Sequence, residues 1–234
     1  MKNLKILSQP NDSTCGPTCL QAVYNFYNDP IDLKEVIRQV HTLDNGGTLA
    51  VMLAINALKR NYKASIYTYN LEIFDPSWFP VKDNEVIINK LKEQLKIKRS
   101  LKFIRASKAY IKFLEMGGEL KFKDLSRKLI ERLFKENTPV LTGLSATYLY
   151  NCQREAVDEN NMMYYSDTKG EPTGHFVILS GFDSNKGKVL VADPYKENPV
   201  SGTNYYSVKT GRLLNSILLG IMTYDANLLI IKPK

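Results

Sequence analysis

The sequence predicts an α+β fold in which an N-terminal helical half packs on a C-terminal antiparallel sheet. Early in the chain, apolar residues recur at helical spacing, as Leu20, Val23, Tyr24 and Tyr27 do. Later, short alternating apolar runs are separated by turn-forming residues, as expected for a β-hairpin over 175–193. Helical segments followed by strand segments are typical of α+β proteins.

The remaining elements follow from the same two periodicities. Asp32 resembles the start of a capping box, and Thr48 can cap the helix that follows it. The stretch 148–170 is polar and irregular, which favours a loop bordering a cleft. The other expected helices cover 32–40, 48–60, 85–116 with a break near Ser100, 123–137 and 212–221, and the other expected strands cover 64–69, 139–145, 204–208 and 228–231.

Length and composition favour one globular domain over 1–234. The chain has 234 residues, of which 44% are hydrophobic, enough for a core. It contains no run of about eighteen apolar residues, and its first nine residues turn polar too soon for a signal peptide. We therefore expect no transmembrane segment and a cytoplasmic location. Three cysteines, an odd number, favour reduced thiols over a disulfide framework.

Cys15 is expected at the start of the first helix. Ser13 and Thr14 can cap the N–H groups there, and Pro17 is tolerated only in a first helical turn. A helix N-terminus carries roughly half a positive charge, which stabilises a thiolate over a thiol. The sequence therefore places a candidate nucleophile at Cys15.

The predicted hairpin supplies a histidine and a carboxylate to accompany this thiol. Folding the chain about Asn185 sets Asp193 opposite Val177, one diagonal step from His175 and on the same face. A His–Asp pair follows from this spacing. Local pattern does not bring Cys15 to His175.

A set of short motifs accompanies these residues, namely Gln9, Cys15–Leu20, Gly47–Thr48, His175–Gly181 and Asp193–Pro194. Together they resemble a known family, the papain-like cysteine peptidases of the C39 and C39-like group. The resemblance implies a papain-like fold, with Cys15 as nucleophile and His175 as general base and acid. It also implies that Asp193 orients the imidazole and that Gln9 donates to the oxyanion beside the Cys15 N–H. Those roles agree with the needs of thiol chemistry.

The separation of 160 residues between Cys15 and His175 exceeds what such domains usually show, and we assign the surplus to 75–118. We expect this segment to be a helical, lysine-rich insertion. The stretch 82–135 holds half of the chain's Lys and Arg residues and carries a net charge of +9, so the positive excess of the whole chain, +8, comes from this stretch. A basic helical stretch is usually a solvated face, and it can also bind nucleic acid, an anionic membrane surface or an acidic partner.

Other candidate residues have plainer interpretations. Cys19 is expected in the core and His41 at the surface or at a helix end. Two histidines and a distant Cys152 offer too few ligands for a metal site, so we expect neither a metal nor a cofactor. The tyrosines near the sheet ends are equally compatible with a cleft and with packing, and they are Tyr148, Tyr150, Tyr164 and Tyr165.

Three hypotheses of function remain open. The first is a cysteine peptidase that hydrolyses a peptide or isopeptide bond through a Cys15 thioester. The second is an acyl transferase that passes the same acyl group to an amine. The third is a non-catalytic peptide-binding domain. The presence of all four residues that the family uses for catalysis disfavours it. We expect a peptide or protein substrate, an acidic one if the lysine-rich segment takes part, and no nucleic acid. The pairs Gly46-Gly47 and Gly117-Gly118 are interpreted as turns.

Overall fold

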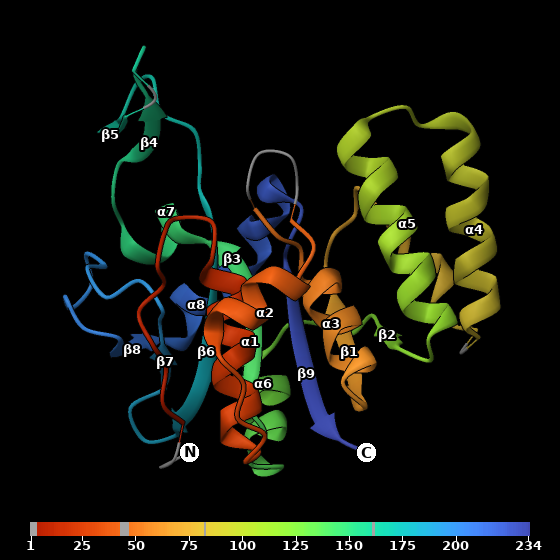
Figure 1. Ribbon diagram of the computed structural model, residues 1–234, viewed down its shortest axis with the longest axis horizontal. Coiled ribbons are helices and arrows are strands. Elements are labelled where there is room, and N and C mark those ends of the chain that lie inside the picture. The colour runs from red at the N-terminus through yellow and green to blue at the C-terminus, as the bar shows by residue number, and fades with distance from the viewer. Residues whose placement is uncertain (1–3, 43–46, 82, 161) are drawn as a thin grey trace.

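The computed structural model describes residues 4–42, 47–81, 83–160 and 162–234. Figure 1 shows a central twisted sheet, a helix pair at one side and a small hairpin projecting from one end. The helices are α1 (Cys15–Phe26), α2 (Leu33–Gln39), α3 (Ala50–Lys59), η1 (Pro76–Trp78), α4 (Asn84–Ile97), α5 (Leu101–Glu115), α6 (Arg127–Lys135), α7 (Ala146–Tyr150), α8 (Thr210–Leu219) and η2 (Gly220–Thr223). The strands are β1 (Tyr62–Thr68), β2 (Glu119–Lys121), β3 (Val140–Ser145), β4 (Arg154–Val157), β5 (Met163–Ser166), β6 (Gly174–Asp183), β7 (Lys188–Ala192), β8 (Tyr205–Lys209) and β9 (Asn227–Pro233).

The main sheet has the strand order β2-β1-β9-β3-β6-β7-β8. Its pairs are antiparallel except for β1 with β2, which run parallel. The predicted α+β class is confirmed, because helices of the N-terminal half pack on this largely antiparallel sheet. The sheet also includes β1 from the N-terminal half, so the two halves interlock.

The alternation of β6 separates two apolar clusters. Phe176 and Ile178 join the cluster built with α1, α3, α4 and α5, whereas Val177 and Leu179 join the cluster built with α6 and α8. Successive side chains of a strand point to opposite faces, so helices cover the sheet on both sides. Burial on both faces explains why β6 reads as a nearly continuous apolar run.

The predicted lysine-rich segment forms the helix pair α4–α5 (Figure 1). The predicted break is confirmed, since Ser100 caps α5 by accepting from the Phe103 N–H at 3.5 Å. Tyr110 of α5 meets the buried ring of Phe74 edge-on, with centroids 4.7 Å apart. The pair thus shares its apolar side chains with the cluster of α1 and α3, while most of its lysines are exposed. The boundary 75–118 stays a prediction.

The stretch 148–170, expected to be a loop, is instead α7 followed by the hairpin β4–β5. Asp158 organises the hairpin turn, since its Oδ1 accepts from the N–H groups of Asn160 and Met162. Neither strand buries a face. A strand that buries no face shows no apolar alternation, so the periodicity argument missed both strands.

Two further expectations concern the ends of α2 and α3. Asp32 caps α2 as expected, because its side chain accepts from the Lys34 N–H at 2.8 Å. The cap expected from Thr48 is wrong: its hydroxyl donates to the carbonyl oxygen of His41, and Leu49 occupies the N-cap position of α3. Within the described residues, none of the helices has the length and apolar character needed to cross a membrane.

Candidate active site

Cys15 is the first residue of α1 and is 8% exposed. The side-chain cap expected from Ser13 and Thr14 is wrong, because both hydroxyls bind Asn11 in the preceding turn. Short polar side chains often bond to a local turn in preference to a helix end. No side chain at the N-cap therefore takes up the N–H groups of the first turn. The positive end of the helix dipole acts directly on the thiol.

His175 and Asp193 form the buried pair that the hairpin spacing predicted. The register pairs Ile178 with Ala192, which sets Val177 opposite Asp193. His175 Nε2 lies 2.8 Å from Asp193 Oδ1, and the two residues are 7% and 0% exposed. Since Nε2 is held by the carboxylate, Nδ1 is the ring atom left to exchange a proton with a neighbour.

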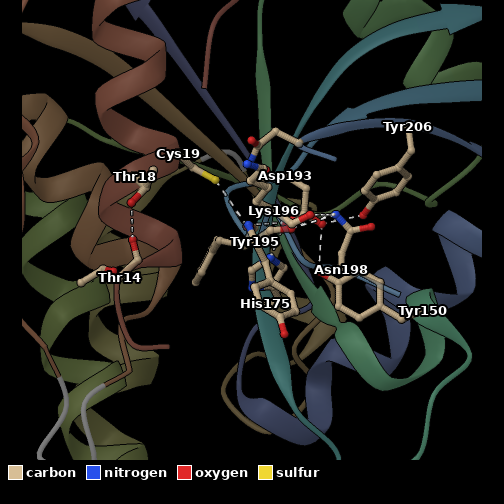
Figure 2. Close-up of polar contacts among 12 residues, drawn as sticks. Thr14, Thr18, Cys19, Tyr150, His175, Asp193, Tyr195, Lys196, Asn198 and Tyr206 are labelled. Atoms are coloured by element: carbon tan, nitrogen blue, oxygen red, sulfur yellow. Dashed lines mark hydrogen bonds and ion pairs between the residues drawn. The ribbon is translucent and has the colours of Figure 1, made fainter. Parts of the chain in front are cut away.

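The Asp193 carboxylate is surrounded by donors (Figure 2). Its Oδ1 also accepts from the Tyr195 N–H at 2.8 Å, and its Oδ2 accepts from the hydroxyls of Tyr150 and Tyr206 at 2.8 and 2.6 Å. Burial raises the pKa of Asp193, but the charge of His175 and these hydrogen bonds outweigh it and hold the pKa below its usual value. Asp193 is therefore a fixed anion beside the imidazole.

Cys15 and Asp193 both act on the charge of the His175 ring. Burial lowers the pKa of His175, but the charge of Asp193, its hydrogen bond, and a hydrogen bond and charge from Cys15 raise the pKa to about 10. The ring is thus protonated at neutral pH when these partners are anionic. The arrangement suits a thiolate–imidazolium pair, the reactive form of a nucleophilic cysteine.

Gln9 lies close to the pair. Its backbone N–H donates to the carbonyl oxygen of Pro194 at 2.9 Å, which ties it to the residue after Asp193. Among the described residues, its side-chain Oε1 is buried and has no hydrogen-bond partner. Gln9 and His175 line the same small cavity, of about 60 Å³. The structure therefore brings all four predicted site residues to one region.

A second cavity, of about 320 Å³, meets the first at Asp12 and Gly174. Cys15 lines this larger cavity, whereas His175 lines the smaller one. The thiol and the imidazole thus face two adjoining spaces.

The other cysteines and histidine occupy plainer surroundings. Cys19 is fully buried and its thiol donates to the carbonyl oxygen of Phe176 at 3.4 Å, so its expected place in the core is confirmed. Burial raises the pKa of both Cys19 and Cys152. His41 is exposed, as expected. The turn at Gly117 is confirmed by its φ of 86°, whereas Gly46 lies outside the described residues.

Sequence reasoning missed part of the Asp193 environment. Of the four tyrosines weighed as cleft residues, Tyr150 binds Asp193, Tyr165 lines the small cavity, and Tyr148 and Tyr164 are exposed. Tyr206 was not singled out. It pairs with Val191 across β7–β8, so extending the predicted hairpin by one strand would have indicated it.

Comparison with known proteins agrees with the sequence resemblance. Residues 107–213 match the Peptidase_C39 like family, a region that contains His175 and Asp193 but not Gln9 or Cys15. The earlier resemblance to that family is thereby confirmed. Among curated proteins, no sequence match was found.

Three solved structures are similar to this chain. The peptidase domain of Streptococcus ComA, a bifunctional ABC transporter involved in quorum sensing, is 11% identical with a TM-score of 0.45, covering 99% of this chain and 100% of the other. A double glycine motif protease from an AMS/PCAT transporter, in complex with the leader peptide, is 13% identical with a TM-score of 0.44, covering 98% and 91%. Xylellain, a cysteine protease from Xylella fastidiosa, is 10% identical with a TM-score of 0.41, covering 99% and 84%.

Proposed function

Because residues 107–213 match the Peptidase_C39 like family, we propose that the chain is a cysteine peptidase that cleaves a peptide or isopeptide bond through an acyl-enzyme on Cys15. The observation that carries this proposal is the buried His175–Asp193 pair, 2.8 Å apart, with the Cys15 thiol at the start of α1 close enough to raise the pKa of His175. A base in reach of the nucleophile and an orienter in reach of the base are the minimum for such chemistry.

The first half of the reaction forms the thioester. His175 holds the proton of Cys15, and the thiolate attacks the substrate carbonyl carbon while the π electron pair moves to the oxygen. The resulting oxyanion accepts hydrogen bonds from the Cys15 N–H and the Gln9 side-chain amide. When the C–N bond breaks, His175 gives its proton to the departing amine.

The second half releases the acyl group. His175, now neutral, takes a proton from water as the water attacks the thioester, and the C–S bond breaks to return the thiolate beside an imidazolium. Asp193 fixes the ring throughout, because its Oδ1 holds Nε2 and keeps Nδ1 toward Cys15. Tyr150 and Tyr206 keep that carboxylate anionic by donating to its other oxygen.

The helix pair α4–α5 has a proposed part in admitting or recruiting the substrate. Lys102 of α5 lines the Cys15 cavity, and Lys98 and Lys102 lie over the rings of Phe103 and Tyr224. If the lysines of 75–118 recruit an acidic peptide or protein, its binding should weaken steeply between low and physiological salt, since exposed charges are screened beyond about 8–10 Å there. Binding that does not change with salt concentration would show that these lysines do not recruit the substrate. The three free thiols fit a reducing compartment, and the cytoplasm is the proposed one.

The proposed reaction can be tested with a library of peptides, incubated with purified protein and read by mass spectrometry. Parallel reactions with and without added amines distinguish hydrolysis from acyl transfer, because water gives a free acid and an amine gives a new amide. Products that depend on Cys15 support the proposal, and Cys152→Ala is the matched control thiol. Products that persist in Cys15→Ala, or a folded protein that cleaves nothing while binding peptides, would contradict it.

A further inference from the structure

One charged group that the proposed reaction does not use lies in the cavity of the nucleophile. Asp225, in the short turn between η2 and β9, lines the cavity of about 320 Å³ together with Cys15 and is 5% exposed. Figure 1 shows the start of β9 at the upper end of the sheet, where α1 also begins. A buried carboxylate is costly unless it is paired, so its presence beside the thiol requires a reason.

The backbone is built around this carboxylate. Tyr224 and Ala226, the residues on either side of Asp225, have φ values of 70° and 57°. Two left-handed residues that are not glycine are an uncommon and strained combination, and such strain gathers at functional sites. Gly143 of β3 leaves the space that the carboxylate needs, since a Cβ there would lie 2.6 Å from Asp225 Cγ.

Asp225 accepts few hydrogen bonds. Its Oδ1 accepts from Asn227 Nδ2 at 3.2 Å, and the N–H of Ala50 at the start of α3 also favours the anion. The ion pairs found within 4 Å among the described residues do not include Asp225. Burial raises the pKa of Asp225 to about 7, outweighing Asn227, Ala50 and the charge of Lys102. A carboxylate can accept about four hydrogen bonds, so acceptor capacity remains.

The position of Asp225 relative to the reacting atoms indicates which part of a substrate it meets. In the proposed reaction, His175 protonates the leaving amine, so the leaving group lies toward the small cavity that His175 lines. The acyl part then extends into the larger cavity, which Cys15 lines. Its volume of about 320 Å³ is at the lower end of the range for small-ligand sites, about 300–1,000 Å³.

We propose that Asp225 is a specificity-determining residue that binds a cationic group, an ammonium or a guanidinium, on the acyl part of the substrate. The exposed Asp12 adds a second carboxylate to the wall of the same cavity. Lys102 is the one cation among the described lining residues, and its Nζ is drawn aside over the Tyr224 ring, 4.6 Å from the centroid. The inference rests on the proposed function, because it requires acylation at Cys15.

The inference can be tested with peptide vinyl sulfones, which report on Cys15 without a known substrate. The thiolate adds to the vinyl carbon β to the sulfone, next to the last peptide residue, and the carbon α to the sulfone takes up a proton, so the protein gains the whole probe mass. A lysine is placed at each of the three positions before the warhead and compared with Nε-acetyl-lysine there. A further pair compares a free with an acetylated N-terminus, which distinguishes a side-chain ammonium from a terminal one.

The measured quantity is the ratio of the inactivation rates for each charged probe and its neutral match. For wild type, at least one pair should show a ratio of roughly tenfold to a hundredfold, as expected for a hydrogen bond between charged groups. Asp225→Asn keeps the shape and the acceptor oxygen and should bring that ratio close to one. Asp12→Asn removes an exposed charge from the same cavity and should lower the ratio by less than about threefold.

A second variant keeps the test independent of the Asp225 turn. Lys102→Met removes the competing cation from an exterior helix and should raise the ratio severalfold. Ratios near one for every wild-type pair, or an unchanged ratio in Asp225→Asn, would overturn the assignment while labelling of Cys15 left the proposed function standing. Failure of every probe to label Cys15 would overturn the proposed function and the assignment with it.

Discussion

Asp193 and Asp225 are two buried carboxyl groups near one thiol, and their surroundings act on them in opposite directions. Asp193 accepts from two tyrosine hydroxyls and a backbone N–H and faces the cationic ring of His175, which hold its pKa below the usual value. Asp225 has Asn227 and the Ala50 N–H, and burial raises its pKa to about 7. Burial is nearly the same for both, so the number and charge of the donors decide the difference.

The comparison distinguishes two roles that a buried carboxylate can have. A carboxylate whose acceptor capacity is filled by the protein is held in one position and one charge state, which suits an orienter. A carboxylate left with spare capacity gains most from a donor that arrives from outside, which suits a binding residue. The following predictions would break or sharpen this distinction.

The largest expected effect is on the Asp193 side of the comparison. His175→Ala should reduce turnover of an identified substrate by roughly three orders of magnitude or more, because nucleophile and base act as a unit. Asp193→Ala should cost less, since orientation is only part of the work of the base. Steady-state kinetics with circular dichroism as a folding control give the comparison. A larger loss for Asp193→Ala would show that the two roles are misassigned.

A Gln9 variant tests whether this residue stabilises the negative charge that develops on the substrate oxygen only during the reaction. Gln9→Ala should lower kcat by roughly 10²–10³ and leave KM close to its original value, because an oxyanion donor acts on the transition state. Separate measurement of kcat and KM checks this. An unchanged kcat would remove Gln9 from the site.

Tyr206→Phe tests whether filled acceptor capacity is what distinguishes Asp193. Loss of a donor to a charged group should lower unfolding free energy by about 1.5–3 kcal/mol and activity by roughly tenfold. The pKa of Asp193 should rise toward its ordinary value. A depressed carboxyl pKa contributes stability above its unfolded value, which is lost as pH falls through the folded value, so acid unfolding should begin at a higher pH.

Tyr69→Phe is the matched control for that experiment. The Tyr69 hydroxyl is buried and has no hydrogen-bond partner among the described residues, so its removal breaks no bond. Its stability should stay within about 0.5 kcal/mol of wild type or increase. Equal losses of unfolding free energy in the two variants would mean that the hydrogen bond from Tyr206 to Asp193 does not stabilise the folded protein.

Asp225 should affect stability with the opposite dependence on pH. Its folded pKa of about 7 lies above the ordinary value of 3.8, so between these values the folded state binds the extra proton. Stability should therefore fall as pH rises from about 4 to 7, by at most about 4 kcal/mol for this group. Asp225→Asn should flatten that slope in urea titrations at several pH values. A slope that persists in the variant would assign the titration to another group.

The sequence predicted the parts of the site that local periodicity determines. The His175–Asp193 contact follows from hairpin register, and the place of Cys15 follows from the helix that Leu20 and Val23 define. The donors around Asp193 could not be predicted as a set, because Tyr150 and Tyr206 come from elements on either side of the hairpin. Asp225 had no periodic signal, since the turn that positions it depends on a glycine of another strand.

Failures of local reasoning had the same origin. Thr48 and Thr14 are of a residue type that often caps helices, but their hydroxyls donate to the carbonyl oxygens of His41 and Asn11 instead. The hairpin β4–β5 buries neither face and so carries no alternation. Tertiary contacts decide whether a polar side chain caps a helix or bonds to a local turn, and whether a strand with no buried face forms at all. One sequence does not reveal those contacts.

The most direct test of the central claim is the order in which the three cysteines react with iodoacetamide near pH 7, read by mass spectrometry of the intact protein and its peptides. Cys15 should label first, because it lies at a helix start beside a ring whose pKa is about 10, whereas burial raises the pKa of Cys19 and Cys152. His175→Ala should slow the labelling of Cys15 toward that of an ordinary thiol with a pKa of about 8.5. Labelling of Cys19 or Cys152 before Cys15 would contradict the account. So would a rate of Cys15 labelling that is the same in His175→Ala as in wild type.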